Sequence, residues 1–352
     1  MQIHGGDIYT REYRIDFSAN INPLGTPKRV LEAACAGVGH AADYPDVECR
    51  ALREAISRRE AVPREWILCG NGAAELIFAL ALAIRPRKAL LVSPGFAEYE
   101  QALLAAGCGC EIRFYECRKE QGFQPGEDYL EQITDDLDLV FLCNPNNPTG
   151  LLLPEELMER IILRCREKKV LLAVDECFNG LLMQGEQVSL IKKLGEMPNL
   201  FLLKAFTKLY AMAGLRLGYG LCSDTELLLR LKQVLQPWNV SIPAQMAGIA
   251  AMEEVDFAKE SCVYVSGERE FLKQGLKKQG IHFYDSQANY LFFEGPPDLY
   301  ERCASEGILI RDCSNYRGLG PGYFRIAVKK RAENEELLRV LARVWTEKEE
   351  RE

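Results

Sequence analysis

The chain has 352 residues, of which 48% are hydrophobic and 27% charged, as is typical of a soluble globular enzyme large enough for two domains. With 43 Lys and Arg residues against 51 Asp and Glu residues, its net charge is −8. This balance, without a basic run, argues against nucleic acid and anionic membranes as partners. The first residues lack the features of a signal peptide, and the longest apolar run, residues 76–84, is too short to span a bilayer. We therefore expect a cytoplasmic protein.

Thirteen cysteines are scattered through the expected strands and helices, an odd number without a disulfide-like framework. This distribution is typical of reduced thiols in a cytosolic protein. Cys108 and Cys110 form the closest pair, but the chain has three histidines and no second cysteine pair at zinc spacing. We therefore predict that the protein has no metal site.

The N-terminal half begins with an arm and continues as alternating strands and helices. Residues 1–25 are rich in Gly, Asn and Pro, which predicts an extended arm. Helices are expected at about 27–39 and 49–59, and strands at about 66–70, 89–94, 111–116, 137–143, 169–175, 200–206 and 216–222. This alternation predicts a large three-layer α/β domain, residues 26–236, with a mostly parallel seven-stranded sheet. Several strands are apolar on both faces, as a sheet covered on both sides requires.

The pattern changes after residue 236. A linker containing Pro237 and Pro243 is followed by long helices at about 244–279. Short strands are expected at 289–293, 307–311 and 323–328, and a charged amphipathic helix at 333–352. We therefore expect a second, smaller α+β domain over residues 237–352.

Residues suited to binding a phosphate follow the first strand of the large domain. The turn Gly70-Asn71-Gly72 opens a helix at Ala73, so backbone N–H groups and the helix dipole can approach a phosphate there. A dinucleotide fingerprint would require a third glycine where Glu75 stands, and no acidic residue ends the next strand. The turn therefore favours a phosphate site but not a Rossmann dehydrogenase.

Two charged residues lie at the ends of other apolar strands, where ligands of parallel sheets bind. Asp175 ends one strand and Lys208 follows another, and both charges are costly there unless something uses them. Desolvation lowers a lysine pKa, and the neutral amine attacks aldehydes. Pyridoxal phosphate (PLP) would suit both residues, since its aldehyde forms a Schiff base with lysine and its pyridinium pairs with a carboxylate. For Lys208 alone, a surface lysine after a core strand is the alternative.

The lysine segment also resembles a known family. Thr207-Lys208 is followed after seven residues by Arg216, within Ala-Gly-Leu-Arg-Leu-Gly-Tyr. This pattern resembles fold-type-I PLP enzymes of the class I/II aminotransferase group, and the loop 144–150, Asn-Pro-Asn-Asn-Pro-Thr-Gly, is similar to theirs. Phe96, which could stack on a pyridine ring or pack in the core, lies in a third similar segment. The resemblance covers nearly the whole chain and implies the fold-type-I PLP transferase fold.

The resemblance also implies roles for particular residues. The expected catalytic residues are Lys208 and Asp175. The expected cofactor-binding residues are Gly72, Ala73, Phe96, Asn147, Asp175, Thr207, Lys208, Arg216 and, reaching the phosphate from the neighbouring subunit of a homodimer, Tyr44. The expected substrate-binding residues are His4, Gly5, Asn20, Asn147, Arg311 and Arg325. By residue type alone, Tyr44 could be a packed surface aromatic and the two arginines could be solvated.

Further segments resemble one branch of the family. Asp-Phe-Ser-x-Asn-x-Asn-Pro at 16–23 is similar to histidinol-phosphate aminotransferases and threonine-phosphate decarboxylases, whereas His4-Gly5-Gly6 and residues 313–320 are closer to the decarboxylases. Phe178 stands where many aminotransferases have Tyr, and Ala205 where relatives often have a hydroxyl.

The resemblance implies decarboxylation of L-threonine O-3-phosphate, or of O-phosphoserine, to an aminoalkyl phosphate that in the family feeds cobamide synthesis. One alternative is an aminotransferase acting on histidinol phosphate or aromatic amino acids. The other is a non-catalytic regulator with the same fold. One methyl group changes the binding free energy in a pocket by only ~1–3 kcal/mol. The sequence therefore does not distinguish between the two phosphoamino acids as substrates.

Overall fold

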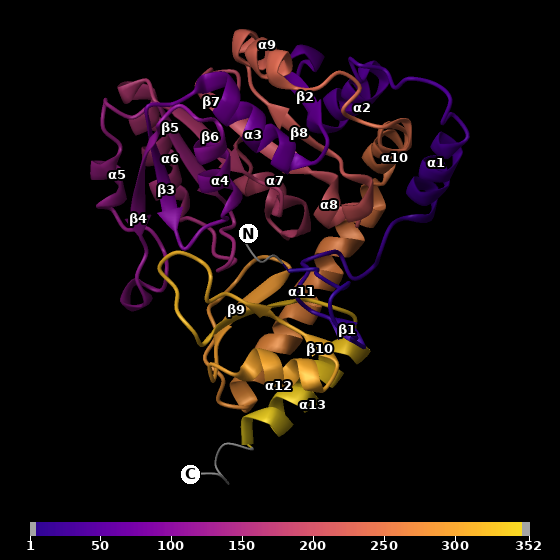
Figure 1. Ribbon diagram of the computed structural model, residues 1–352, viewed down its shortest axis with the longest axis vertical. Coiled ribbons are helices and arrows are strands. Elements are labelled where there is room, and N and C mark those ends of the chain that lie inside the picture. The colour runs from indigo at the N-terminus through magenta and orange to yellow at the C-terminus, as the bar shows by residue number, and fades with distance from the viewer. Residues whose placement is uncertain (1–4, 347–352) are drawn as a thin grey trace.

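A computed structural model describes residues 5–346, and its centre is a seven-stranded sheet of order β2-β8-β7-β6-β5-β3-β4 (Figure 1). The strands are β2 (Ile67–Gly70), β3 (Lys88–Ser93), β4 (Glu111–Glu116), β5 (Leu139–Cys143), β6 (Leu171–Asp175), β7 (Leu200–Ala205) and β8 (Gly218–Leu221). Within the described sheet β8 alone runs antiparallel to its neighbours, β2 and β7. The mostly parallel seven-stranded sheet predicted from the sequence is confirmed.

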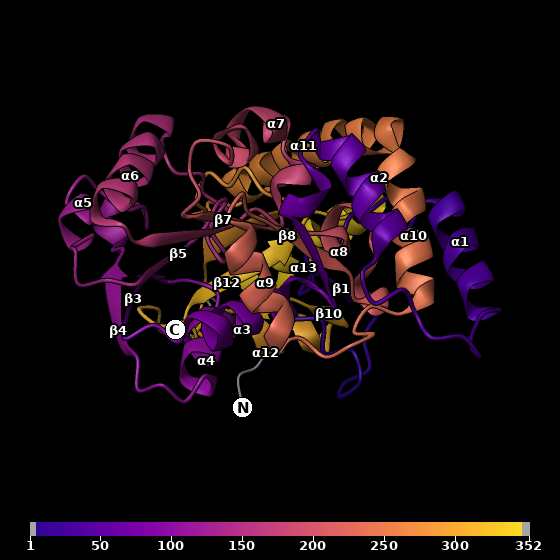
Figure 2. The ribbon, with the colours of Figure 1, turned by 90° about the horizontal axis from the view of Figure 1, so that it is seen from above.

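Helices cover both faces of this sheet, as the view from above shows (Figure 2). Those near one face are α3 (Ala73–Ile84), α4 (Glu98–Ala105) and α9 (Thr225–Val234), and those near the other are α2 (Arg50–Glu60), α5 (Tyr129–Gln132) and α6 (Glu155–Lys168). Alternate strand residues enter different cores: in β5, Leu139 and Phe141 join the first and Val140 and Leu142 the second. This three-layer arrangement explains why the central strands are apolar at most positions on both faces.

The C-terminal part contains a three-stranded antiparallel sheet of order β11-β12-β9. Its elements are β9 (Tyr290–Glu294), α12 (Leu299–Ser305), β10 (Ile308–Leu309), β11 (Arg311–Asp312), β12 (Tyr323–Ala327) and α13 (Arg331–Thr346). The long helix α11 (Val255–Lys278) runs from the upper to the lower part in Figure 1. Before it, α10 (Ile242–Glu253) packs against α2 and α1 (Lys28–Val38). The smaller α+β part is thus present, while the boundaries after residues 25 and 236 stay a prediction.

The single strand expected at 307–311 is wrong, because this segment serves two sheets. β10 pairs in parallel with β1 (Ile15–Asp16) of the N-terminal arm, whereas β11 pairs antiparallel with β12. The partner changes at Ile310, which lies between the two strands. The arm is therefore joined to the C-terminal part, and Arg311 begins a strand instead of ending one.

Two general properties of the described chain bear on its chemistry. No helix in residues 5–346 combines the length and the apolarity needed to cross a lipid bilayer. All thirteen cysteines lie within this range, and none of them is in a disulfide.

Candidate active site

Lys208 lies in the short helix α8 (Phe206–Leu209), directly after β7. Its Nζ atom is 5.4 Å from the centre of the Phe178 ring. Burial, aided by the charge of Arg325, lowers the pKa of Lys208 to about 8. Its main-chain carbonyl accepts a hydrogen bond from the Asn22 N–H at 3.1 Å, which ties the N-terminal arm to this helix. The side chain therefore has the lowered pKa that a nucleophilic lysine requires.

Asp175 ends β6 and is 5% exposed. Its Oδ2 accepts a hydrogen bond from the Tyr99 hydroxyl at 2.8 Å, and its Oδ1 accepts one from the Cys177 N–H at 2.9 Å. Tyr99 is held in turn by stacking on Phe141, with ring centres 4.9 Å apart. Asp175 forms no salt bridge within residues 5–346, so a buried carboxylate is fixed in place without a cationic partner.

Asn147, in the loop after β5, connects the large sheet to the C-terminal part. Its Oδ1 accepts hydrogen bonds from Arg325 Nη1 and, at 3.2 Å, from the Tyr316 hydroxyl. Arg325 Nη2 also donates to the Ser18 carbonyl at 3.1 Å. These donors orient the amide of Asn147, so its NH2 group is the part suited to donate to a ligand.

Arg311 and Arg325 are cross-strand neighbours in register on β11 and β12, and each is 6% exposed. Arg311 donates to the Asn315 side chain at 2.8 Å and lies 5.4 Å from the Tyr316 ring centre. The Nε atom of Arg325 is buried and has no hydrogen-bond partner among the described residues. Two buried guanidinium groups thus belong to neighbouring residues of the small sheet, and their positive charges suit an anion.

The predicted phosphate site lies at the N-terminus of α3. Gly72 precedes the helix with φ +83°, and no side chain in residues 5–346 caps the first N–H groups. A Cβ atom on Gly72 would lie 2.6 Å from Nη2 of Arg216, so glycine is what allows this guanidinium to approach the turn. Free N–H groups from Ala73 onward and an adjacent arginine form a suitable phosphate site.

The N-terminal arm covers the site from the side of Arg325. A Cβ atom on Gly5 would lie 2.2 Å from the Ser18 carbonyl oxygen, and the Gly6 N–H donates to the Ser18 hydroxyl at 2.7 Å. Asn20 is 2% exposed, and its Oδ1 has no partner within the described chain. His4 lies outside the described residues.

The remaining predicted residues occupy different surroundings. Thr207 is partly buried beside Lys208 in α8. Phe96 is partly buried after β3, and its ring meets the Tyr99 ring edge-on at 5.5 Å. Tyr44 is 78% exposed and lies against Trp238, with ring centres 4.6 Å apart. The contact expected between Tyr44 and a neighbouring subunit stays a prediction.

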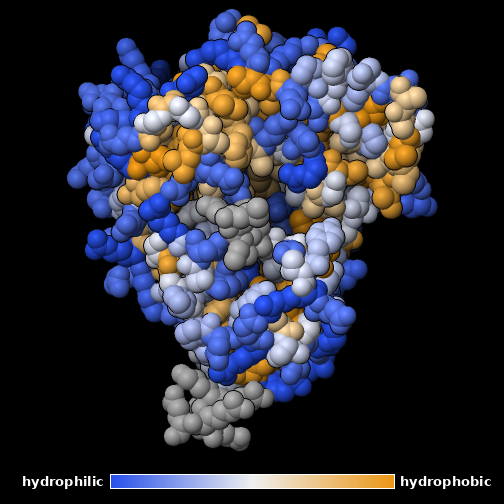
Figure 3. Space-filling model, in the orientation of Figure 1, coloured by the Kyte–Doolittle hydropathy of each residue, from blue (hydrophilic) through white to orange (hydrophobic). Residues whose placement is uncertain are grey.

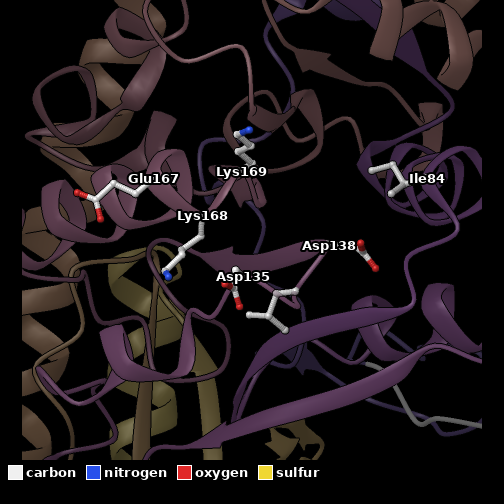
Figure 4. A pocket seen from close by; sticks show the side chains of 7 residues that line it. Ile84, Asp135, Asp138, Glu167, Lys168 and Lys169 are labelled. Atoms are coloured by element: carbon white, nitrogen blue, oxygen red, sulfur yellow. The ribbon is translucent and has the colours of Figure 1, made fainter.

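A separate pocket of about 570 Å³ lies at the ends of the strands opposite to those that carry Asp175 and Lys208 (Figure 4). It is lined by Ile84, Asp135, Leu137, Asp138, Glu167, Lys168 and Lys169, which precede β5 and β6 or lie at the ends of α3 and α6. Parallel sheets bind ligands at the carboxyl ends of their strands, and this pocket is at the amino ends. It is therefore not the active site.

Comparison with known proteins identifies the family. Residues 13–341 match the family of class I and II aminotransferases. The chain belongs to this family. It is 38% identical to the threonine-phosphate decarboxylase of Salmonella typhimurium strain LT2, across 97% of this chain and 96% of that protein.

Solved structures agree with this assignment. The histidinol-phosphate aminotransferase of Clostridium acetobutylicum is 30% identical, with a TM-score of 0.88 over 95% of this chain and 100% of that one. The L-threonine-O-3-phosphate decarboxylase of Porphyromonas gingivalis is 24% identical, with a TM-score of 0.80 over 93% and 98%, and shows the shared fold. The chain is a PLP-dependent enzyme with the fold-type-I transferase fold predicted from its sequence.

The class I/II aminotransferase site has the groups that PLP requires. Asp175 offers a buried carboxylate without a cationic partner for the pyridine nitrogen, and Lys208 offers an amine of lowered pKa for the aldehyde. The uncapped start of α3, with Arg216 beside it, suits the phosphate. The described residues therefore fit the cofactor.

Sequence reasoning assigned no role to Tyr99 or Tyr316. Tyr99 holds Asp175 across 76 positions of sequence, and Tyr316 reaches Asn147 across 169. Both lie inside segments that resembled the family, Pro-Gly-Phe-Ala-Glu-Tyr and residues 313–320. A tyrosine within a segment that resembles the family is therefore the sequence feature that could have indicated a role for each of them.

Proposed function

We propose that this enzyme decarboxylates L-threonine O-3-phosphate, or O-phosphoserine, to the corresponding aminoalkyl phosphate. The observation that carries the proposal is the pair of buried, cross-strand arginines, Arg311 and Arg325, of which Arg325 lies close enough to Lys208 to help lower its pKa. Two guanidinium groups suit a substrate that carries both a carboxylate and a phosphate. The 38% identity to a threonine-phosphate decarboxylase supports the same assignment.

In this reaction, different residues would bind the substrate and transfer the proton. When bound, PLP accepts the electron pair left on the substrate Cα as CO2 departs. Arg311 and Arg325 bind the two anionic groups and so orient the bond between Cα and the carboxylate for cleavage. Lys208, with its pKa of about 8, can hold a proton and deliver it to Cα, which replaces the lost C–C bond by a C–H bond.

An aminotransferase acting on histidinol phosphate is the second candidate, supported by the 30% identity and TM-score of 0.88 to the Clostridium acetobutylicum enzyme. It would use the same cofactor site but remove the Cα proton instead of CO2. Phe178 weighs against it, because the ring beside Lys208 lacks the phenol that many aminotransferases have there.

The deciding experiment measures CO2 and glutamate separately. The enzyme is incubated with O-phosphothreonine, O-phosphoserine or histidinol phosphate, with and without 2-oxoglutarate. We expect CO2 from a phosphoamino acid without any oxo acid. Arg325→Ala should reduce this rate more than tenfold while retaining PLP, since truncating one partner of a buried charged contact costs about 2–5 kcal/mol. Glutamate from histidinol phosphate, with no CO2 from either phosphoamino acid, would establish the aminotransferase instead.

We further propose a homodimer with shared active sites in the cytoplasm. Exposed aromatic side chains at Tyr44 and Trp238 are suited to a subunit contact. Apolar surface also covers the flank formed by α1, where Leu31 and Val38 are exposed (Figure 3). A sedimentation measurement that finds a fully active monomer would contradict the dimer.

The proposed location in the cytoplasm is supported by the cysteines. Their unpaired thiols favour a reducing compartment.

A further inference from the structure

The loop between β11 and β12, residues 313–322, places two adjacent side chains in contact with different parts of the molecule. Tyr316 contacts residues of the active site, and Arg317 contacts the outer strands of the large sheet. The loop itself belongs to the C-terminal part, immediately after Arg311. It is therefore a connection between the substrate arginines and the large sheet.

Tyr316 lies among three groups of the active site. Its hydroxyl donates to Asn147 Oδ1 at 3.2 Å and lies 3.4 Å from Arg325 Nη1. The guanidinium of Arg311 lies over its ring, 5.4 Å from the centre. One side chain thus contacts both arginines and the asparagine that orients Arg325, so a displacement of Tyr316 would disturb all three.

Arg317 is fixed to the large sheet by three contacts from three elements. Its Nη2 donates to Glu100 on α4 at 2.7 Å, and its guanidinium lies 4.0 Å from the centre of the Phe114 ring on β4. Its carbonyl accepts a hydrogen bond from the hydroxyl of Ser93, the last residue of β3, at 2.7 Å. The next residue, Gly318, packs so closely that a Cβ atom there would lie 2.9 Å from the same hydroxyl.

We propose that Arg317 is a positioning residue for substrate binding. It fastens the 313–322 loop to the large sheet and so holds Tyr316 between the two substrate arginines. The Arg317 side chain is 50% exposed, and an exposed ion pair contributes little to global stability, so its effect is expected on the site and not on folding. The inference rests on the proposed function for the identity of the substrate, but not for the contacts themselves.

The kinetic test compares Arg317→Ala, Arg317→Lys and a matched control. Arg160→Ala serves as the control, because it removes another exposed arginine that pairs with a glutamate, Glu127, away from the loop. We expect Arg317→Ala to raise KM for the substrate about tenfold with kcat changed less than about twofold, because it loses both the ion pair and the aromatic contact. Arg317→Lys should restore part of the affinity through Glu100, since lysine keeps the charge but not the planar stacking.

A second measurement does not depend on catalysis. Chymotrypsin cleavage of the holoenzyme after Tyr316, mapped by mass spectrometry, should be several-fold faster in Arg317→Ala than in wild type and unchanged in Arg160→Ala. PLP content and unfolding temperature should match wild type. An unchanged KM, or a cleavage rate equal to that of wild type, would overturn the proposal. If the wild type consumes only histidinol phosphate, the decarboxylase proposal fails, and KM for that compound together with the cleavage rate still tests Arg317.

Discussion

Lys204 and Lys208 are four residues apart on the β7–α8 segment, yet their surroundings shift the pKa values of the two amines in opposite directions. Burial lowers the pKa of Lys204, but Glu60 and Glu176 outweigh burial and leave the pKa raised. Its Nζ lies 3.2 Å from Glu60 and 3.8 Å from Glu176. Lys208 is partly buried near Arg325 instead, and its pKa falls to about 8.

The difference between the two lysines arises from their positions, one within a strand of the sheet and one past the end of that strand. Lys204 extends toward α2, which supplies Glu60, whereas Lys208 lies past the strand end, where the C-terminal part supplies Arg325. Partial burial is common to both, so the sign of the neighbouring charges decides whether the pKa of the amine is raised or lowered. A partly buried lysine on this segment thus pairs with carboxylates in one place and, in the role that we propose, reacts with the cofactor in the other.

The largest effect should come from Lys208→Ala. Because the variant lacks the amine that we propose bonds the cofactor and moves the proton, we expect the catalytic rate to fall on the order of 10²–10⁴-fold. Borohydride reduction and peptide mapping should attach PLP to Lys208 in the wild type and to no residue in the variant. The matched control is Lys204→Met, which should keep the label at Lys208. Labelling of another lysine in the wild-type enzyme would refute the assignment.

Lys204→Met should instead reduce stability. It leaves the carboxylates of Glu60 and Glu176 without their shared cation, and removing one partner of a buried ion pair costs about 3–5 kcal/mol. Urea titrations of the apo-protein near pH 7 would measure this loss. Lys208→Met should show no such loss, because a folded-state pKa below that of free lysine means that the charged form is disfavoured by folding at this pH. Equal free energies of unfolding in the two variants would contradict the predicted difference between Lys204 and Lys208.

The smallest effect is a pH dependence of cofactor binding. Only the neutral amine attacks the aldehyde, so the rate at which apo-enzyme incorporates PLP should rise with pH up to the Lys208 pKa of about 8 and level off above it. An unperturbed lysine would continue to gain rate up to about pH 10.4. Stopped-flow absorbance across pH 6–10 would distinguish the two, and a midpoint above 10 would contradict the lowered pKa.

Much of the fold could be predicted because the central strands are apolar on both faces. Segments such as 139–142 allow few arrangements other than a sheet covered by helices on both sides. The segment at 307–311 was mistaken for one strand because its two halves pair with different partners, and nothing in a run of Ile and Leu marks the change at Ile310. Pairing with the distant arm is a tertiary effect that local patterns do not contain.

Part of the candidate site could be predicted because some charged residues follow apolar strands, where burial makes a charge costly. A carboxylate at Asp175 and an amine at Lys208, each following an apolar strand, are costly enough to indicate a ligand. Tyr99 was not predictable in this way, because tyrosine side chains are common in hydrophobic cores. Its hydroxyl contacts Asp175 only once α4 has packed on the sheet. Tyr316 and Arg317 likewise depend on contacts between distant parts of the chain.

The pairing of β1 with β10 has a consequence for the synthesis of the chain. Ile15 leaves the ribosome early, but its partner, Ile308, is made 293 residues later. At a translation rate of about 5–20 residues per second, the arm waits roughly 15–60 s before its strand partner exists. During that interval the large sheet, complete by Leu221, can form while the arm stays unpaired. The arm, whose Ser18 contacts Arg325, is thus among the last segments to be put in place in a newly made molecule.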